Sequence, residues 1–101
     1  MTRARVGIDV GGTKVLGVAL DPAGEVEREL RRDTPRGDGS VDELIDTIAS
    51  VARELGADRS LGVGVPGLVT RAGVLRAAPN LDGVADVGVA ALLRQATGLD
   101  V

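Results

Sequence analysis

Hydrophobic and polar residues alternate in the first third of the chain. Residues 6–10 and 25–32 show this two-residue periodicity, and residues 14–20 between them form a β-branched, apolar run. These patterns predict three β-strands, and the charged side chains along the third run place one face of that strand in water. The segments 11–13 and 21–24 contain the glycine and proline of tight turns, so we expect the three strands to be joined by hairpins.

The periodicity changes after the third strand. Between Val41 and Leu55, apolar residues recur every three or four positions, which is the spacing of one helix face. Ser40 and Glu43 form a capping-box pair, and Gly56 stands where glycine commonly ends a helix. The sequence therefore predicts a helix that begins at Ser40 and buries one stripe against the sheet.

Shorter patterns follow this helix. Alternation over residues 61–65 predicts a fourth strand, and residues 66–80 are rich in turn-forming residues. Asp86 is a candidate cap for a last helix that ends near Thr97, after which residues 99–101 resemble the start of another strand. The order of three strands, helix, strand, loop, helix and strand indicates an α/β fold with a mixed sheet.

Length and composition narrow the possible functions. At 101 residues the chain is one domain or part of one. It contains no His, Cys, Phe, Tyr or Trp, which excludes a thiol nucleophile, a histidine base, zinc sites made of those ligands and aromatic platforms for nucleic-acid bases. The net charge of −3 and the absence of a long apolar run argue against nucleic-acid and membrane partners. We expect a cytoplasmic protein.

Residues 9–14, which read Asp-Val-Gly-Gly-Thr-Lys, are the first candidate site. Glycines at a hairpin tip allow successive backbone amides to turn toward an anion, which makes a phosphate-binding loop. Thr13 can add a hydroxyl donor and Lys14 a positive charge, and Asp9 can hold Mg²⁺ through water. On spacing alone, an ordinary hairpin in which Gly11 and Gly12 merely permit the turn is an equally good interpretation.

Two further motifs lie in the second half of the chain. Residues 62–67 match the dinucleotide-binding pattern G-x-G-x-x-G, but that pattern must follow a strand and open a helix, whereas here it begins inside a strand and reaches a proline. We therefore reject a dinucleotide site. Residues 66–80 are the third candidate, because loops at a strand's carboxyl end line ligand sites and the Asn80 amide suits a sugar hydroxyl. On pattern alone, a simple Pro79-Asn80 turn is the favoured interpretation.

Two segments resemble a known family. Residues 6–21, VGIDVGGTKVLGVALD, and residues 62–80, GVGVPGLVTRAGVLRAAPN, are similar to the N-terminal part of the ROK family of sugar kinases and sugar-responsive repressors. The resemblance covers nearly the whole chain and implies a ribonuclease-H-like fold of the actin-like ATPase type, a mixed sheet flanked by helices. Residues 1–101 would form the N-terminal ATPase-type lobe, the first lobe of a two-lobed kinase that binds ATP and sugar between its lobes.

The resemblance also implies roles for individual residues. The phosphate loop for ATP, at residues 9–14, would consist of Asp9, Gly11, Gly12, Thr13 and Lys14, with Asp9 near Mg²⁺ through water. The sugar-side loops at residues 66–80 would contact the sugar through Gly67 and Asn80.

Other family features are expected outside this chain. The general base is an aspartate expected just beyond Val101, and the family's structural zinc site lies further downstream, so the chain resembles a lobe truncated before the catalytic Asp. Asp82, Asp86 and Asp100 are interpreted as surface or cap residues. We expect this chain alone to be inactive and to self-associate, because the edge of the strand at residues 61–65 would be unpaired.

The leading hypothesis is ATP-dependent phosphorylation of a hexose by the full-length parent, a glucokinase-like activity that uses ATP and Mg²⁺. The expected partners are the hexose, the second lobe of the same protein and a second copy in a homodimer. Two alternatives stay open, a sugar-responsive repressor of the same family and a non-catalytic remnant. Family repressors carry a helix-turn-helix domain before the phosphate loop, and only eight residues precede Asp9, which favours the kinase. The identity of the sugar stays open, as does the choice between ATP and polyphosphate as donor.

Overall fold

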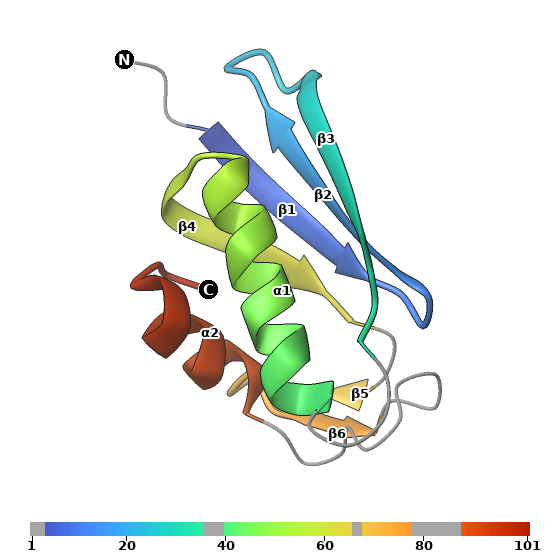
Figure 1. The fold of residues 1–101 in the computed structure, drawn as a ribbon. Helices are drawn as coiled ribbons and strands as arrows, with labels where there is room; N and C mark the ends of the chain where they lie inside the picture. The colour runs from blue at the N-terminus through green and yellow to red at the C-terminus, as the bar shows by residue number, and fades with distance from the viewer. Residues whose placement is uncertain (1–3, 36–39, 66–67, 78–87) are drawn as a thin grey trace.

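The computed structural model describes residues 4–35, 40–65, 68–77 and 88–101. Their elements, in chain order, are β1 (Ala4–Val10), β2 (Lys14–Leu20), β3 (Val26–Asp33), α1 (Ser40–Glu54), β4 (Ala57–Gly64), β5 (Leu68–Val69), β6 (Leu75–Ala77) and α2 (Val89–Thr97). Figure 1 shows α1 lying across the larger sheet, with α2 beside it and the short β5–β6 hairpin near the end of β4.

The four-stranded sheet has the order β3-β2-β1-β4. Its first three strands are antiparallel, and β4 runs parallel to β1. The predicted mixed sheet and the first three strands are confirmed, with β3 ending one residue later than expected. The turn between β2 and β3 is also confirmed. Gly24 has a φ of 85°, and the Asp21 carboxylate accepts hydrogen bonds of 2.9 Å from the amides of Ala23 and Glu25.

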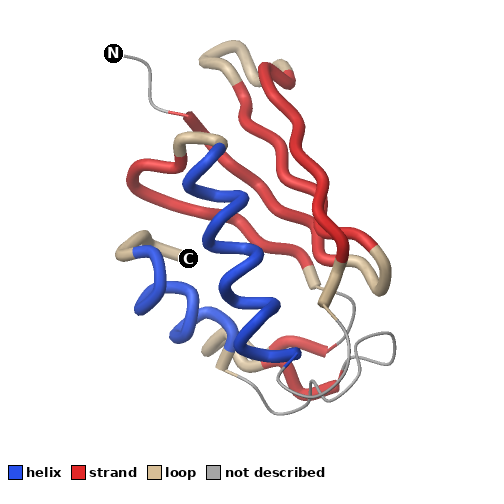
Figure 2. Tube along the Cα trace, viewed as in Figure 1, coloured by secondary structure: helices blue, strands red, loops and turns tan. Residues whose placement is uncertain are grey.

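The predicted helix is confirmed as α1, and it packs against one face of the sheet (Figure 2). The core contains the apolar stripe of α1, the alternating residues of β1, β2 and β4, and residues of β6 and α2: Val6, Ile8, Val10, Val15, Ala19, Leu44, Ile45, Ile48, Val51, Ala52, Leu55, Leu61, Leu75, Val89 and Leu93. At Gly17, helix and sheet meet so closely that a Cβ would lie 2.4 Å from Val51 Cγ1. Glycine at this position therefore allows the close approach of α1.

The opposite face of the sheet is less covered. Gly7, Leu16 and Val18 lie on it half-buried, and Gly62 is exposed. Residues on this face alternate with core residues along each strand, as the two-residue periodicity requires. The described part of the chain thus forms two layers, helices on one side and the sheet on the other.

The structure corrects three expectations for the second half. Residues 66–80, for which the sequence predicted a turn-rich segment and no strand, contain the antiparallel strands β5 and β6, which are too short to show a periodicity. β4 begins at Ala57 rather than Leu61, because its parallel pairing with β1 starts at Ala57, before the alternating apolar residues. The last helix, α2, begins at Val89 with Gly88 at its N-cap, later than a cap at Asp86 would place it, and Asp86 itself lies outside the described residues.

The last residues of the chain approach the sheet beside β4, where the sequence predicted the approach to another strand. Asp100 pairs with Ser60 of β4 in parallel, and its backbone exchanges hydrogen bonds of 2.9 and 2.8 Å with Arg59 and Leu61. The expectation of an unpaired edge is therefore wrong at Leu61, since the chain's own end pairs there.

Candidate functional site

The first predicted site lies where β1 and β4 end side by side. Because the two strands are parallel, their carboxyl ends meet at the same edge of the sheet. The chain leaves β1 toward β2 on one side, and Asp100 pairs with Ser60 of β4 on the other. Ligands of open α/β sheets bind at such a point, where successive connections diverge.

Asp9 projects from this edge. Its side chain is exposed, and it lies in register with Leu16 on one neighbour and Gly64 on the other. A Cβ at Gly64 would lie 3.6 Å from Asp9 Oδ1, so the absence of a side chain leaves space beside the carboxylate. Asp9 and Gly64 line a groove of about 340 Å³ on the less covered face of the sheet, together with Gly7, Ile8, Leu16, Val18 and Gly62.

The loop between β1 and β2 is held in shape by its own backbone. The Gly11 amide donates a hydrogen bond of 2.8 Å to the Lys14 carbonyl, and a Cβ at Gly11 would lie only 3.1 Å from that oxygen. Glycine at position 11 therefore permits a close turn, and its amide is used within the turn. The side-chain donors of the loop are the Thr13 hydroxyl and the Lys14 ammonium.

The end of β3 contacts the same loop. The amide of Thr34 donates a 2.9 Å hydrogen bond to the Thr13 carbonyl, and its hydroxyl donates a 2.7 Å hydrogen bond to the Gly11 carbonyl. Thr34 is 6% exposed and is the one buried polar or charged residue in the described part of the chain. Sequence analysis did not single out Thr34 as a site residue. Its side chain points to the helix-covered face of the sheet, as do those of Arg32 and Leu30, two and four residues earlier along the alternation.

Asp33 is a second residue that sequence analysis missed. The Lys14 ammonium donates a hydrogen bond to its carboxylate, and the two residues are cross-strand neighbours. This hydrogen bond, together with the positive charge of Lys14, lowers the pKa of the Asp33 carboxyl below its ordinary value. Both side chains are largely exposed, at 59% for Lys14 and 85% for Asp33, so water screens the pair and a phosphate can compete for the ammonium.

The residues present suit a hydrated magnesium ion. Among the described residues, no group of three His, Cys, Asp or Glu side chains could form a metal cage. A single exposed carboxylate such as Asp9 fits Mg²⁺, which keeps much of its water shell and binds phosphate oxygens alongside one or two carboxylates. The candidate sugar residues Gly67 and Asn80 lie outside the described residues.

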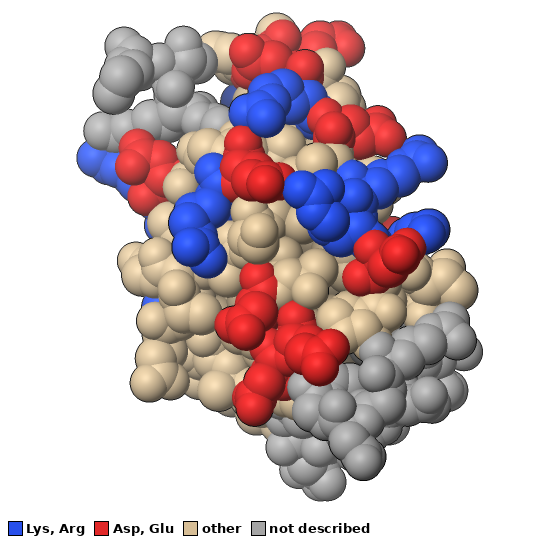
Figure 3. Space-filling model, viewed as in Figure 1, with Lys and Arg blue, Asp and Glu red and all other residues tan. Residues whose placement is uncertain are grey.

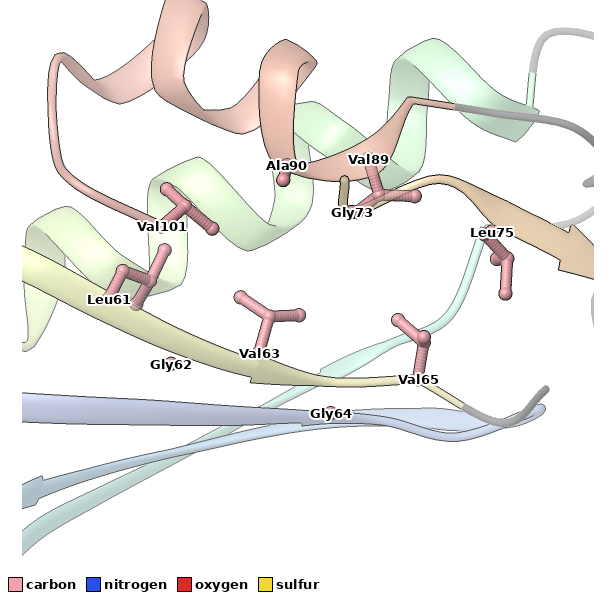
Figure 4. Close-up of a pocket in the computed structure, with 10 residues that line it drawn as sticks. All are labelled: Leu61, Gly62, Val63, Gly64, Val65, Gly73, Leu75, Val89, Ala90 and Val101. Carbon is pink, nitrogen blue, oxygen red and sulfur yellow. The ribbon is translucent and has the colours of Figure 1, made fainter. Parts of the chain in front are cut away.

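A second cavity, of about 430 Å³, lies on the other face of β4. Val63 and Val65 point into it from the strand, with Leu75 of β6 and Val89 of α2 also on its wall (Figure 4). The described residues that line it are aliphatic or glycine, and none of them carries a polar side chain. These residues can bury apolar groups but provide no side chain for chemistry, so we assign the candidate site to the end of the sheet near Asp9.

Charged side chains of both signs lie close together on part of the molecular surface. On the face shown in Figure 3, basic and acidic side chains lie interspersed over its upper half. Arg32 pairs with Glu54 at 2.6 Å and Arg31 with Glu29 at 3.2 Å, so each of these cations has an acidic neighbour. No helix in the described ranges is long and apolar enough to cross a lipid bilayer.

Comparison with known proteins identifies relatives of this chain. The profile of the ROK family matches residues 5–101. An N-acetyl-D-glucosamine kinase of Escherichia coli O1:K1 is 36% identical over 75 residues, which are 71% of this chain and 25% of that kinase. The chain thus spans about a quarter of the length of this curated relative.

Two solved structures share the fold. A ROK family glucokinase from Streptomyces griseus, in complex with glucose and AMPPNP, superposes with a TM-score of 0.83 at 25% identity, covering 97% of this chain and 31% of that one. An inorganic polyphosphate/ATP-glucomannokinase from Arthrobacter sp. strain KM superposes with a TM-score of 0.82 at 29% identity, covering 98% and 42%. The predicted fold class, a mixed sheet with flanking helices of the actin-like ATPase type, is confirmed.

Proposed function

Since the chain belongs to the ROK family, we propose that its full-length parent is a sugar kinase that transfers the γ-phosphoryl group of ATP to a hexose hydroxyl. The observation that carries this proposal is the position of residues 9–14, a glycine-containing loop beside an exposed carboxylate at the point where β1 and β4 end together. Relatives named as an N-acetyl-D-glucosamine kinase and a glucokinase with bound glucose and AMPPNP support a hexose substrate and ATP.

Within this chain, the phosphate loop would bind and orient the nucleotide. The backbone of Gly11 and Gly12 would shape the loop around the phosphates, while the Thr13 hydroxyl and the Lys14 ammonium would donate hydrogen bonds to them. Asp9 would hold a hydrated Mg²⁺, which supplies positive charge for the transferring phosphoryl group. Phosphate would displace Asp33 from Lys14, so the exposed pair would open when the nucleotide binds.

The reaction also requires a general base and contacts to the sugar. The hexose hydroxyl oxygen forms a bond to the γ-phosphorus while the bond to the ADP oxygen breaks, and the hydroxyl proton moves to a base. By family resemblance, that base would be an aspartate expected beyond Val101, and Gly67 and Asn80 would contact the sugar. The second lobe would close the cleft, and the homodimer, the cytoplasmic location and the boundaries of the lobe stay predictions.

The test is sugar-dependent ADP formation by the full-length parent, measured with glucose, fructose, mannose, N-acetylglucosamine and N-acetylmannosamine. We expect at least one sugar to stimulate ADP formation, and the variant Asp9→Asn to lose that activity while keeping its thermal midpoint. A parallel series with polyphosphate identifies the donor by the formation of sugar phosphate.

The outcomes distinguish the competing functions. Sugar binding without phosphorylation by either donor would favour the repressor alternative. Failure to bind or phosphorylate any of the five sugars would overturn the proposed function.

A further inference from the structure

Thr34 stands out because its environment differs from that of the strand it follows. Seven of the eight residues of β3 are exposed, whereas Thr34, directly after the strand, is 6% exposed. A buried hydroxyl requires a hydrogen-bond partner, and the partner here is the Gly11 carbonyl, at 2.7 Å. The acceptor therefore belongs to the candidate phosphate loop itself.

The hydrogen bonds of Thr34 fix two peptide planes of this loop. A peptide group is planar and trans, so the carbonyl of Gly11 and the amide of Gly12 point in opposite directions. The hydroxyl that holds the Gly11 carbonyl consequently sets the direction of the Gly12 N–H. The Thr34 amide, at 2.9 Å from the Thr13 carbonyl, sets the direction of the Lys14 N–H in the same way.

Both backbone polar groups of Gly11 are held by hydrogen bonds. Its amide donates to the Lys14 carbonyl within the turn, and its carbonyl accepts the hydrogen bond from the Thr34 hydroxyl. A loop that is held on both sides before the ligand arrives loses less conformational freedom when the ligand binds, and binding is tighter for that reason.

We propose that Thr34 is a positioning residue that holds the phosphate loop in the shape that receives the nucleotide, through its hydroxyl on Gly11 and its amide on Thr13. This inference rests on the proposed kinase function. Thr34 acts through the loop and does not itself touch the substrate. Its hydroxyl therefore affects the nucleotide and not the sugar.

The test compares three variants of the full-length parent. Thr34→Val removes the hydroxyl and keeps the branched shape, and Thr34→Ser keeps the hydroxyl. Thr97→Val is the matched control, because the Thr97 hydroxyl also donates to a backbone carbonyl, that of Leu93 at 2.6 Å, but lies in α2. If Thr34→Val does not fold, Thr34→Cys, with a weak thiol donor, carries the same comparison.

We expect Thr34→Val to raise the KM for MgATP by between about twofold and tenfold, the effect of one hydrogen bond, with the KM for sugar unchanged. Thr34→Ser and Thr97→Val should keep both values at the wild-type level. The proposal would be overturned if Thr34→Val changed the KM for MgATP and the KM for sugar equally, or changed neither. It would also be overturned if Thr34→Ser behaved like Thr34→Val.

Amide hydrogen exchange provides a measurement that does not depend on activity. In Thr34→Val, the amides of residues 11–14 should exchange faster than in the wild type, while Thr97→Val should leave them unchanged. A wild-type parent without sugar-dependent ADP formation would overturn the kinase function, whereas unchanged exchange in Thr34→Val would overturn the role of Thr34.

Discussion

The substitution Gly64→Ala tests whether the space beside Asp9 is part of the active site. The φ angle of Gly64 lies outside the left-handed region, so alanine can adopt the same backbone. The new Cβ would lie 3.6 Å from Asp9 Oδ1, an ordinary van der Waals distance, and no other side chain of the described residues lies within 4 Å of it. The fold should therefore tolerate the change, with a gain of about 0.4 to 1 kcal/mol from the lower entropy of the unfolded chain.

The expected loss of activity follows from the geometry of the carboxylate. A water molecule of a hydrated Mg²⁺ would lie about 2.8 Å from the Asp9 oxygen, so a methyl group at 3.6 Å competes for the same side of the carboxylate. Loss of one charge-assisted hydrogen bond costs about 1.5 to 3 kcal/mol, which is about tenfold to a hundredfold in kcat/KM for MgATP.

Gly62→Ala is the matched control for this experiment. Gly62 lies on the same strand and face, two residues earlier, and a Cβ there would have no neighbour within 4 Å. Both variants of the full-length parent are assayed for kcat/KM with MgATP and for thermal midpoint. Wild-type activity in Gly64→Ala, or an equal loss in Gly62→Ala, would refute the position of the metal beside Asp9.

Other variants test the remaining assignments. Gly17→Ala should lower the free energy of unfolding of the 101-residue chain by about 1 to 3 kcal/mol in urea, since α1 must move outward, while Gly7→Ala on the opposite face should not. Asp9→Asn and Lys14→Ala in the full-length parent should each lower kcat/KM for MgATP at least about tenfold with little change in thermal midpoint; a large loss of stability with normal turnover would favour an ordinary hairpin. Asn80→Ala should raise the KM for sugar about twofold to tenfold and leave the KM for ATP unchanged. A raised KM for ATP with an unchanged KM for sugar would instead assign Asn80 to the nucleotide site.

The four-stranded sheet and its long helix could be predicted because their signals are local. Alternation along residues 6–10 and the three-to-four spacing after Val41 each repeat often enough to be recognised. β5 and β6 have two and three residues, too few to show any period, and their pairing depends on the turn at Gly73, whose φ is 80°.

The candidate site, too, could be predicted only in part from the sequence. Asp9 and the glycines after it form a contiguous motif, so the sequence alone indicates a loop that can bind phosphate. The contacts of Asp33 and Thr34 with that loop join residues about twenty positions apart, and these contacts exist only because β3 pairs with β2. Asp21-Pro22-Ala23-Gly24 predicts the hairpin that permits this pairing, but not the exact register that places Thr34 against Gly11.

The two edges of the sheet have different capacities for growth. β3 forms one edge, and six of its seven exposed side chains are charged, three acidic and three basic. Arg28 and Arg32 both donate hydrogen bonds to Glu54, the last residue of α1. A strand added there would have to bury or rearrange these charges, which protects this edge from aggregation. At the opposite edge, Asp100 already forms backbone hydrogen bonds with β4. A further strand can therefore be added more readily beside β4 than beside β3. An engineered strand or reporter peptide intended to pair with this sheet should be designed against β4.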